Sequence, residues 1–299
     1  MMYVVYEEIY MNSCKINNVE YIYTKELVFK LLKNDTYSVE LHDMTIEEII
    51  VPETYEGKPV TKIDFFGFAG CSNLKRVLLP KTIEIIKHSI FKYSDKVEEI
   101  IVDDENKYFK SYEYNLYSKD LKTLILYVNS KNKTKFTVPS FVTTIAPFAF
   151  TFKNNVEEVI LNDTLTLIEH SSFFHCANLR HITLSNKIKA IKHSTFNFCT
   201  NLDNIIIPNS VTVIEKAAFK YCGNLKNIKF SQNLKEIKEE AFESCTSLDN
   251  VLLPNSLEVI EENAFKWCIN LVNIYIPTNI KNIDDCAFEN TNIDMNTIK

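Results

Sequence analysis

One spacing constrains this chain more than any other feature: cysteine recurs every 23 residues through its C-terminal half. The five residues are Cys176, Cys199, Cys222, Cys245 and Cys268. Loops set the spacings of a disulfide framework and make them irregular, so an even spacing indicates a structural repeat. A phenylalanine stands three residues before each of these cysteines, and the phenylalanine series extends at the same period to Phe150 and Phe288.

The other apolar residues fall into columns at fixed offsets from that phenylalanine. Isoleucine stands five residues before it in nine repeats, from Ile63 to Ile283. Apolar residues also recur nine and eleven residues after it, which is the alternation of a β-strand that points every second side chain inward. Proline follows this strand in several repeats and ends it, because proline cannot donate a ladder hydrogen bond. One unit cannot bury these side chains alone, whereas stacked units can.

The resulting unit, L-x-x-I-x-[IL]-[PSN]-x-x-[VL]-x-x-I-x-x-x-A-F-x-x-C-x-x, resembles the BspA-like leucine-rich repeat family. Residues 49–63, IIVPETYEGKPVTKI, resemble the family's elongated first unit, and residues 102–127 resemble its hairpin-like insertion. The resemblance covers about residues 27–293. It implies an α/β leucine-rich-repeat solenoid of stacked 23-residue repeats. A parallel β-sheet would form one face, with short turns or 3₁₀/helical segments on the other.

The same pattern predicts one solenoid domain preceded by a short extension. The expected parts are an N-terminal extension at 1–26 and a solenoid at 27–299, which comprises an irregular N-terminal cap repeat at 27–64, an insertion at 103–137 and regular repeats at 138–293. We expect the insertion to protrude from one edge. The chain has only four glycines, which suggests that stacked Ile, Phe and Pro columns hold the turns without left-handed backbone.

Composition excludes several classes of protein. A hydrophobic content of 46% and a net charge of -6 exclude a disordered chain, and the acidic balance argues against nucleic-acid binding through a basic face. No run of about 18 apolar residues predicts a membrane-spanning helix. The opening residues, MMYVVYEEIYMNSCK, lack the basic and apolar regions of a signal peptide.

The residues that could carry chemistry fit structural roles better. We interpret the cysteines as compact inward-facing side chains, and free buried thiols suit a reducing or anaerobic compartment. His170 and His193 stand at one column in adjacent repeats, with His88 at that column earlier, but no third metal ligand recurs with them. No nucleophile, zinc or phosphate-binding motif appears. We therefore predict no catalytic residue, no metal and no cofactor.

The outward strand positions are the candidate binding face. One column runs from charged residues to four asparagines that could form a side-chain ladder, and the next is largely apolar although it should face solvent. The candidates are Leu78, Ile101, Ile160, His181, Asn204, Ile206, Asn227, Lys229, Asn250, Leu252, Asn273 and Tyr275. The competing interpretation is that β-branched residues simply suit strand surfaces. Aromatic residues two positions after the repeat phenylalanine form a third column, interpreted as packing or as a second contact surface.

These observations predict a non-catalytic protein-recognition scaffold that binds or adheres to a macromolecular partner through its strand face. The family resemblance implies a cell-surface or secreted protein that binds host or matrix proteins. The missing signal peptide leaves a cytoplasmic location open, so the alternative is an intracellular structural or interaction scaffold with an unknown protein partner. We expect a monomer that neither binds nucleic acid nor spans a membrane.

Overall fold

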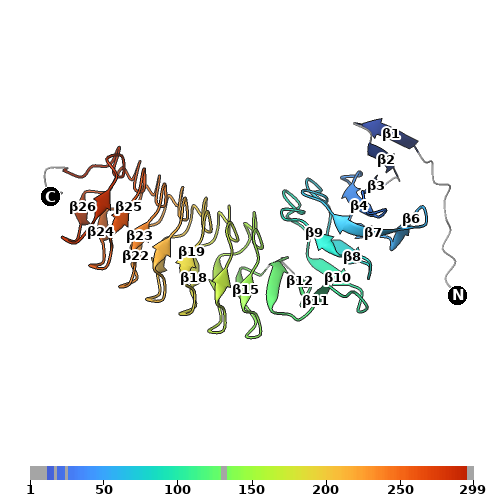
Figure 1. Ribbon diagram of the computed structural model, residues 1–299, viewed down its shortest axis with the longest axis horizontal. Helices are drawn as coiled ribbons and strands as arrows, with labels where there is room; N and C mark the ends of the chain where they lie inside the picture. The colour runs from blue at the N-terminus through green and yellow to red at the C-terminus, as the bar shows by residue number, and fades with distance from the viewer. Residues whose placement is uncertain (1–11, 17–18, 24–25, 129–132, 295–299) are drawn as a thin grey trace. The chain divides into compact units, whose positions relative to one another are not determined.

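Stacked coils of parallel β-strands build the chain (Figure 1). The computed structural model describes residues 12–16, 19–23, 26–128 and 133–294, and it divides into two compact units, residues 1–119 and 120–299. Equivalent residues of successive repeats pair in register, as Ile214 does with Ile237. The leucine-rich-repeat solenoid is therefore confirmed. The boundary between the units falls inside the 103–137 insertion, and a single domain over 27–299 stays a prediction.

The first unit begins with antiparallel strands and continues into parallel ones. Its strands are β1 (Asn12–Ile16), β2 (Val19–Tyr23), β3 (Leu27–Leu31), β4 (Tyr37–Leu41), β5 (Glu48–Ile50), β6 (Thr54–Tyr55), β7 (Lys58–Ile63), β8 (Arg76–Leu79), β9 (Ile85–Ile86), β10 (Glu99–Val102), β11 (Phe109–Tyr112) and β12 (Asn115–Ser118). Strands β1 to β4 form an antiparallel meander that ends on β7, to which β4 is parallel. The meander supplies the irregular first layer that a repeat stack needs at its end.

The second unit contains the regular repeats. Its strands are β13 (Thr123–Leu126), β14 (Lys135–Thr137), β15 (Thr144–Ile145), β16 (Glu158–Ile160), β17 (Leu167–Ile168), β18 (His181–Thr183), β19 (Ala190–Ile191), β20 (Asn204–Ile206), β21 (Val213–Ile214), β22 (Asn227–Lys229), β23 (Glu236–Ile237), β24 (Asn250–Leu252), β25 (Val259–Ile260), β26 (Asn273–Tyr275) and β27 (Asn282–Ile283). From β14 onward, strands of three residues alternate with strands of two residues, and the two kinds form separate parallel sheets along the stack.

The three-residue strand ends where the sequence pattern places proline. Where proline is replaced, a polar side chain bonds the neighbouring backbone instead. The Ser185 hydroxyl donates to the Leu165 carbonyl at 2.6 Å, and the Asn162 amide donates to the carbonyls of Pro139 and Val142 at 2.7 and 3.1 Å. These bonds give serine and asparagine a strand-ending role equivalent to that of proline.

The far side of each coil consists of turns, the first of the two expected alternatives. The described residues contain no helix, so the α component of the expected α/β class is absent from them. No helix in this part of the chain could span a membrane. The turns stack through a third set of hydrogen bonds, in which the amides of Ala217, Phe219 and Tyr221 donate to carbonyls of the next repeat at 2.8–2.9 Å.

The turns do use left-handed backbone, contrary to the expectation drawn from the few glycines. Two positions in most repeats, two residues before and two residues after the phenylalanine, have positive φ. Those before it are Phe66, Ser89, Phe148, Ser171, Ser194, Ala217, Glu240 and Asn263; those after it are Gly70, Tyr93, Phe152, His175, Phe198, Tyr221, Ser244, Trp267 and Asn290. Only one of these residues is glycine. The hydrogen bonds to the next repeat hold conformations that cost about 1–2 kcal/mol in an isolated L-residue.

A column of stacked phenylalanine rings forms the centre of the second unit. Successive ring centroids from Phe150 to Phe288 lie 4.6–5.5 Å apart, with interplanar angles of 18° or less. The neighbouring columns of isoleucine, leucine and cysteine are almost completely buried. The expected inward columns are therefore all present.

The first part of the insertion packs on the molecule and does not protrude freely. Hairpin β11–β12 lies beside β10, whose Ile100 amide donates to the Tyr114 carbonyl at 3.0 Å and whose Val102 amide donates to the Ser111 hydroxyl at 3.2 Å. A bare strand edge would leave these amides without protein acceptors, which explains why the hairpin folds back.

Replacing Phe219 with alanine should reduce the free energy of unfolding by about 3–5 kcal/mol, because it opens a cavity between two stacked rings. Urea unfolding followed by circular dichroism measures this change. The matched control Tyr275→Ala truncates an aromatic side chain that is 49% exposed and should cost far less. Equal losses in both variants would contradict the inward assignment.

Replacing Ser244 with glycine should raise the free energy of unfolding by about 0.5–1 kcal/mol. Ser244 has a φ of 61°, and glycine adopts this left-handed conformation without strain. The strain energy that is removed exceeds the free-energy cost of the extra conformational entropy that glycine gives the unfolded chain. The control Ser247→Gly lies three residues later, at a residue without positive φ, and should destabilise. A loss of stability in Ser244→Gly would show that the turn carries no strain at this position.

Candidate interaction surface

The three-residue strands of the second unit present two columns of side chains to solvent. The first outward column contains Glu158, His181, Asn204, Asn227, Asn250 and Asn273, and the second contains Ile160, Thr183, Ile206, Lys229, Leu252 and Tyr275. Within the sheets β14-β16-β18, β20-β22 and β24-β26, residues of one column pair directly, so they lie one strand spacing, about 4.8 Å, apart. All are exposed except Glu158 and Ile160, which are half-buried.

Apolar side chains in the second column are held in water. Ile206 is 66% exposed and Leu252 is 72% exposed, while the residues on either side of them in sequence are buried. The strand geometry imposes this, because alternate side chains of one strand must face opposite sides. Thr183 and Lys229 interrupt the apolar column, so it is a broken strip.

The expected asparagine ladder forms only in part. The Asn273 amide donates to the Asn250 side-chain oxygen at 2.8 Å, the one amide-to-amide bond that this column shows among the described residues. Asn204 instead turns toward Asp203 and lies 3.5 Å from Nδ1 of His181. Side-chain torsions decide between these partners.

A second asparagine ladder, which the sequence reasoning missed, runs along the turn that precedes the three-residue strand. Asn201 donates to Asn178 at 3.1 Å, and Asn224 donates to Asn201 at 3.0 Å. The signal was present, because asparagine recurs there at the 23-residue period. Because these amides bond one another, they stabilise the stack, and we do not count them as a binding site.

The corresponding face of the first unit combines charge with apolar surface. Arg76 lies between Glu48 and Glu99, with a distance of 3.1 Å to each carboxylate, and these hydrogen bonds raise its pKa, that to Glu48 most. The neighbouring column consists of Ile50, Leu78 and Ile101 in register. Ile50 is 62% exposed, whereas the predicted candidates Leu78 and Ile101 are half-buried.

Two open hollows mark this part of the face. The apolar hollow has a volume of about 420 Å³ and is lined by Ile50, Leu78 and Ile101 together with residues at the ends of their strands. The charged hollow has a volume of about 430 Å³ and is lined by Glu47, Glu48, Lys75, Arg76, Glu98 and Glu99.

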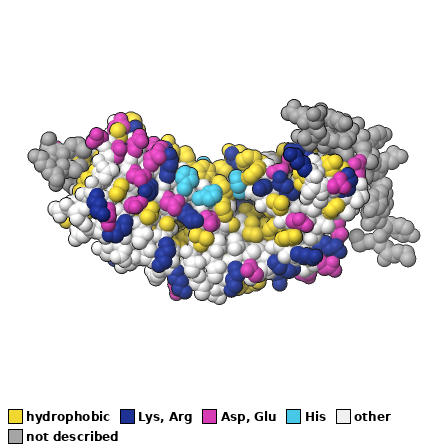
Figure 2. Space-filling view, in the orientation of Figure 1, with side chains coloured by type: hydrophobic (Ala, Val, Ile, Leu, Met, Phe, Trp, Pro, Cys, Tyr) yellow, Lys and Arg dark blue, Asp and Glu magenta, His cyan; other side chains and the backbone are white. Residues whose placement is uncertain are grey.

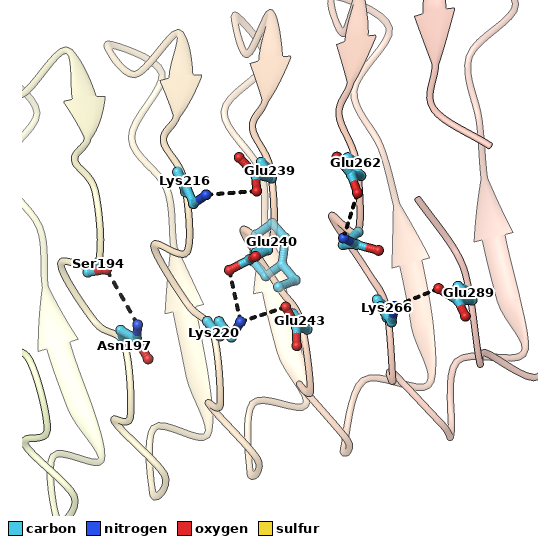
Figure 3. A network of polar contacts seen from close by, with 12 residues as sticks. Ser194, Asn197, Lys216, Lys220, Glu239, Glu240, Glu243, Glu262, Lys266 and Glu289 are labelled. Carbon is cyan, nitrogen blue, oxygen red and sulfur yellow. Dashed lines mark hydrogen bonds and ion pairs between the residues drawn. The ribbon is translucent and has the colours of Figure 1, made fainter. Parts of the chain in front are cut away.

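The turn side of the second unit carries lysines paired with acidic residues of the neighbouring repeat. Lys216 bonds Glu239 at 2.7 Å, and Lys220 bonds both Glu240 and Glu243 at 2.8 Å (Figure 3). Figure 2 shows acidic and basic side chains interspersed over the C-terminal repeats. Each of these pairs joins one repeat to the next, so the arrangement contributes to the stack.

The aromatic column of the turn side is a packed stack. Phe152, His175, Phe198 and Tyr221 follow one another with centroid distances of 4.5–5.5 Å. Their faces contact one another, and Tyr221 is only 36% exposed. Packing therefore describes these four residues, whereas Tyr93 and Trp267 at the same repeat position are 61% and 47% exposed, so the second contact surface stays a prediction.

The histidine column packs against aromatic and serine side chains. The ring of His170 lies edge-on to Phe148 at 5.3 Å, and Nε2 of His193 lies 3.2 Å from the Ser194 hydroxyl. Among the described residues, no group of three or more His, Cys, Asp or Glu side chains is placed to hold a metal ion.

The cysteine column has a specific role in the stack. Each thiol from Cys176 to Cys268 points to the carbonyl of the phenylalanine one repeat earlier, at 3.0–3.2 Å. Ser94 makes the same bond with its hydroxyl to the Phe68 carbonyl at 2.8 Å. Burial raises the pKa of all five thiols, to about 12 for Cys176 and Cys268, so they stay protonated donors. Such thiols are poor nucleophiles.

Comparison with known proteins gives the family. The model described as the BspA type leucine rich repeat region (6 copies) matches residues 40–132, 125–249 and 199–299. No curated protein sequence matches the chain significantly.

Solved structures of bacterial leucine-rich repeat proteins share the fold. One from Bacteroides ovatus is 21% identical with a TM-score of 0.61, covering 90% of this chain and 68% of the other. One from Eubacterium ventriosum is 18% identical with a TM-score of 0.58, covering 90% and 94%. The pneumococcal vaccine antigen PcpA is 14% identical with a TM-score of 0.59, covering 94% and 98%.

The buried thiols predict a loss of stability in alkali. Thiols of the unfolded chain ionise above a pH of about 9, whereas the folded thiols keep their protons until their raised pKa is reached. Between these limits the free energy of unfolding should fall by about 1.4 kcal/mol per pH unit for each buried thiol.

Cys222→Ala should make this decline shallower by the contribution of one thiol. Urea unfolding at several pH values between about 8.5 and 10.5, which begins near the pKa of an unfolded thiol, measures the slope. The control Cys286→Ala removes an exposed thiol and should leave the slope unchanged. Identical slopes in the two variants would contradict the assignment.

Proposed function

The chain belongs to the BspA type leucine-rich repeat family, and on that premise we propose that it is a non-catalytic recognition scaffold that binds a protein partner through its strand face. The observation that carries the proposal is the exposure of Ile206 and Leu252 on a regular β-ladder. Covering large apolar side chains with a partner lowers the free energy of the complex by about 25 cal/mol per Å² of apolar surface removed from water.

Rigidity of the face supports the same conclusion. Backbone hydrogen bonds join every strand that bears these side chains to a neighbouring strand, and the phenylalanine column lies behind them. A partner therefore meets side chains on a backbone that is already ordered, which reduces the entropy lost on binding. Asparagine amides beside the apolar residues offer both donors and acceptors to the partner backbone.

The partner proposed first is a host or matrix protein, as the family resemblance implies, which makes adhesion the function. The free thiols favour the second candidate, an intracellular interaction scaffold. The seven cysteines from Cys71 to Cys286 are all unpaired, and Cys286 is exposed, which suits a reducing compartment. Protease treatment of intact cells, with detection of the chain by antibody, distinguishes the two: cleavage supports adhesion, and protection supports the scaffold.

Ile206→Glu combined with Leu252→Glu should abolish partner binding and change the free energy of unfolding by less than about 1 kcal/mol, because both residues are solvent-exposed. Quantitative pull-down by wild type and variant, with urea unfolding of each, measures both effects. The control Thr212→Glu places the same charge outside the strand face, beside β21, and should bind as wild type does. Unchanged binding in the double variant would refute the proposed face.

A further inference from the structure

The apolar hollow and the charged hollow of the first unit lie on the same strands, whose outward residues alternate between acidic and apolar side chains. Along β10 and the residue after its end, Glu99, Ile101 and Asp103 stand two residues apart. Alternate residues of an extended strand face the same side at intervals of about 6.6–6.8 Å. The surface therefore presents a carboxylate, an apolar floor and a second carboxylate in rows across the strands.

The apolar row is large enough to take a side chain. Ile50, Leu78 and Ile101 lie in register on β5, β8 and β10 and line the hollow of about 420 Å³. Pro52 and Pro80 follow two of these strands and bound the hollow where the ladder stops. Because Ile50 is 62% exposed, this floor remains available to a ligand.

The two outer rows carry excess negative charge. The charged hollow is lined by four carboxylates and two cations, and the apolar hollow adds Glu53 and Asp103, with Lys81 beside it at 3.9 Å from Glu53 and 2.9 Å from Glu105. Lys75 and Arg76 are already paired with Glu47, Glu48 and Glu99. Within the described part of the chain, no lysine or arginine nitrogen lies at ion-pair distance from Glu98 or Asp103. Both carboxylates can therefore accept a cation from a ligand.

The face of the second unit lacks this charge. There Glu158 is paired with Lys135 at 2.9 Å, and asparagines continue the same column. The acidic residues on the turn side bond lysines of the preceding repeat (Figure 3). An apolar floor between Glu98 and Asp103, neither of which has an ion-pair partner among the described residues, is thus a property of the first unit.

We infer that the strand face of the first unit binds an extended protein segment that carries Lys or Arg, an apolar residue, and Lys or Arg at alternate positions. The apolar side chain enters the hollow above Leu78, and the two cations reach the rows that contain Glu98 and Asp103. The spacing matches directly at Asp103, which stands two residues after Ile101, the period of an extended segment. Glu98 stands one residue beyond Glu99, so the other Lys or Arg reaches it by its long side chain. This inference rests on the proposed function, since it names the partner chemistry for part of the strand face.

Three synthetic peptides test the inference on the full-length protein by fluorescence anisotropy. The first contains Lys-Ser-Leu-Ser-Lys, the second replaces leucine with serine, and the third replaces both lysines with glutamate. We expect the first peptide to bind, with an affinity that falls as salt is raised, and the other two to bind at least about tenfold more weakly. Failure of the first peptide to bind, or equal binding of all three, would overturn the inference.

Substitutions locate the binding. Glu98→Gln with Asp103→Asn removes the charge and keeps the side-chain size, so affinity for the first peptide should fall about tenfold. Ile50→Ser should also weaken binding, because it removes apolar floor at an exposed position. The control for lost charge, Asp163→Asn on the second unit, should bind as wild type does. Ile206→Ser tests the other possible location, because it alters the strand face of the second unit.

The outcomes separate this inference from the proposed function. If Ile206→Ser weakens peptide binding and the first-unit variants do not, the inference fails while the strand face of the second unit remains the binding surface. If the first-unit variants lose the peptide but Ile206→Glu with Leu252→Glu leaves partner binding intact, the inference stands and the proposed face of the second unit fails. Loss of fold in a first-unit variant is detected by circular dichroism, and the less drastic Glu98→Gln alone then carries the test.

Discussion

The stacking of one phenylalanine on the next is the contact on which the regular repeats depend. A single coil cannot cover its own ring, so each ring is buried only when a further coil follows at about 5 Å. That distance is also the spacing of hydrogen-bonded strands, and the ring column and the backbone ladders therefore support one another. Once the spacing is set, the cysteine thiol reaches the phenylalanine carbonyl one repeat earlier, and lysines reach carboxylates 23 residues away.

Hydrogen bonding between coils also explains how a chain with four glycines turns so often. Residues such as Trp267 and Glu240 adopt left-handed backbone conformations that glycine would adopt with less strain. The amides of the turn bond carbonyls of the next repeat, and those bonds outweigh the strain. A residue with a side chain at these positions makes a contact between repeats that glycine could not make: Phe198 and Tyr221 stack, and Glu240 pairs with Lys220.

The same regularity shapes the surface. Every position of the repeat becomes a column, so a residue type that recurs in the sequence becomes a strip on the molecule. Where neighbouring rungs carry complementary groups, as along the turn side, the side chains pair with one another, and each exposed pair adds at most about 1 kcal/mol to the stack. Where they do not, as at Ile206 and Leu252 or around Glu98 and Asp103, we propose that a partner binds. This distinction separates structural columns from candidate sites.

The sequence by itself determined the period, the inward columns, the strand that ends at proline and the set of outward residues, because stacking at constant spacing converts linear offsets into positions. It also gave the family through the motif around the phenylalanine and cysteine. Only the tertiary structure decided which polar neighbours bond, for instance that Asn273 bonds Asn250 while Asn204 turns to Asp203. It decided that the hairpin of the insertion covers the edge of β10, that the turns adopt positive φ, and that Glu98 has no ion-pair partner among the described residues. These features depend on torsion angles and on contacts between residues far apart in the chain, and a repeat pattern encodes neither.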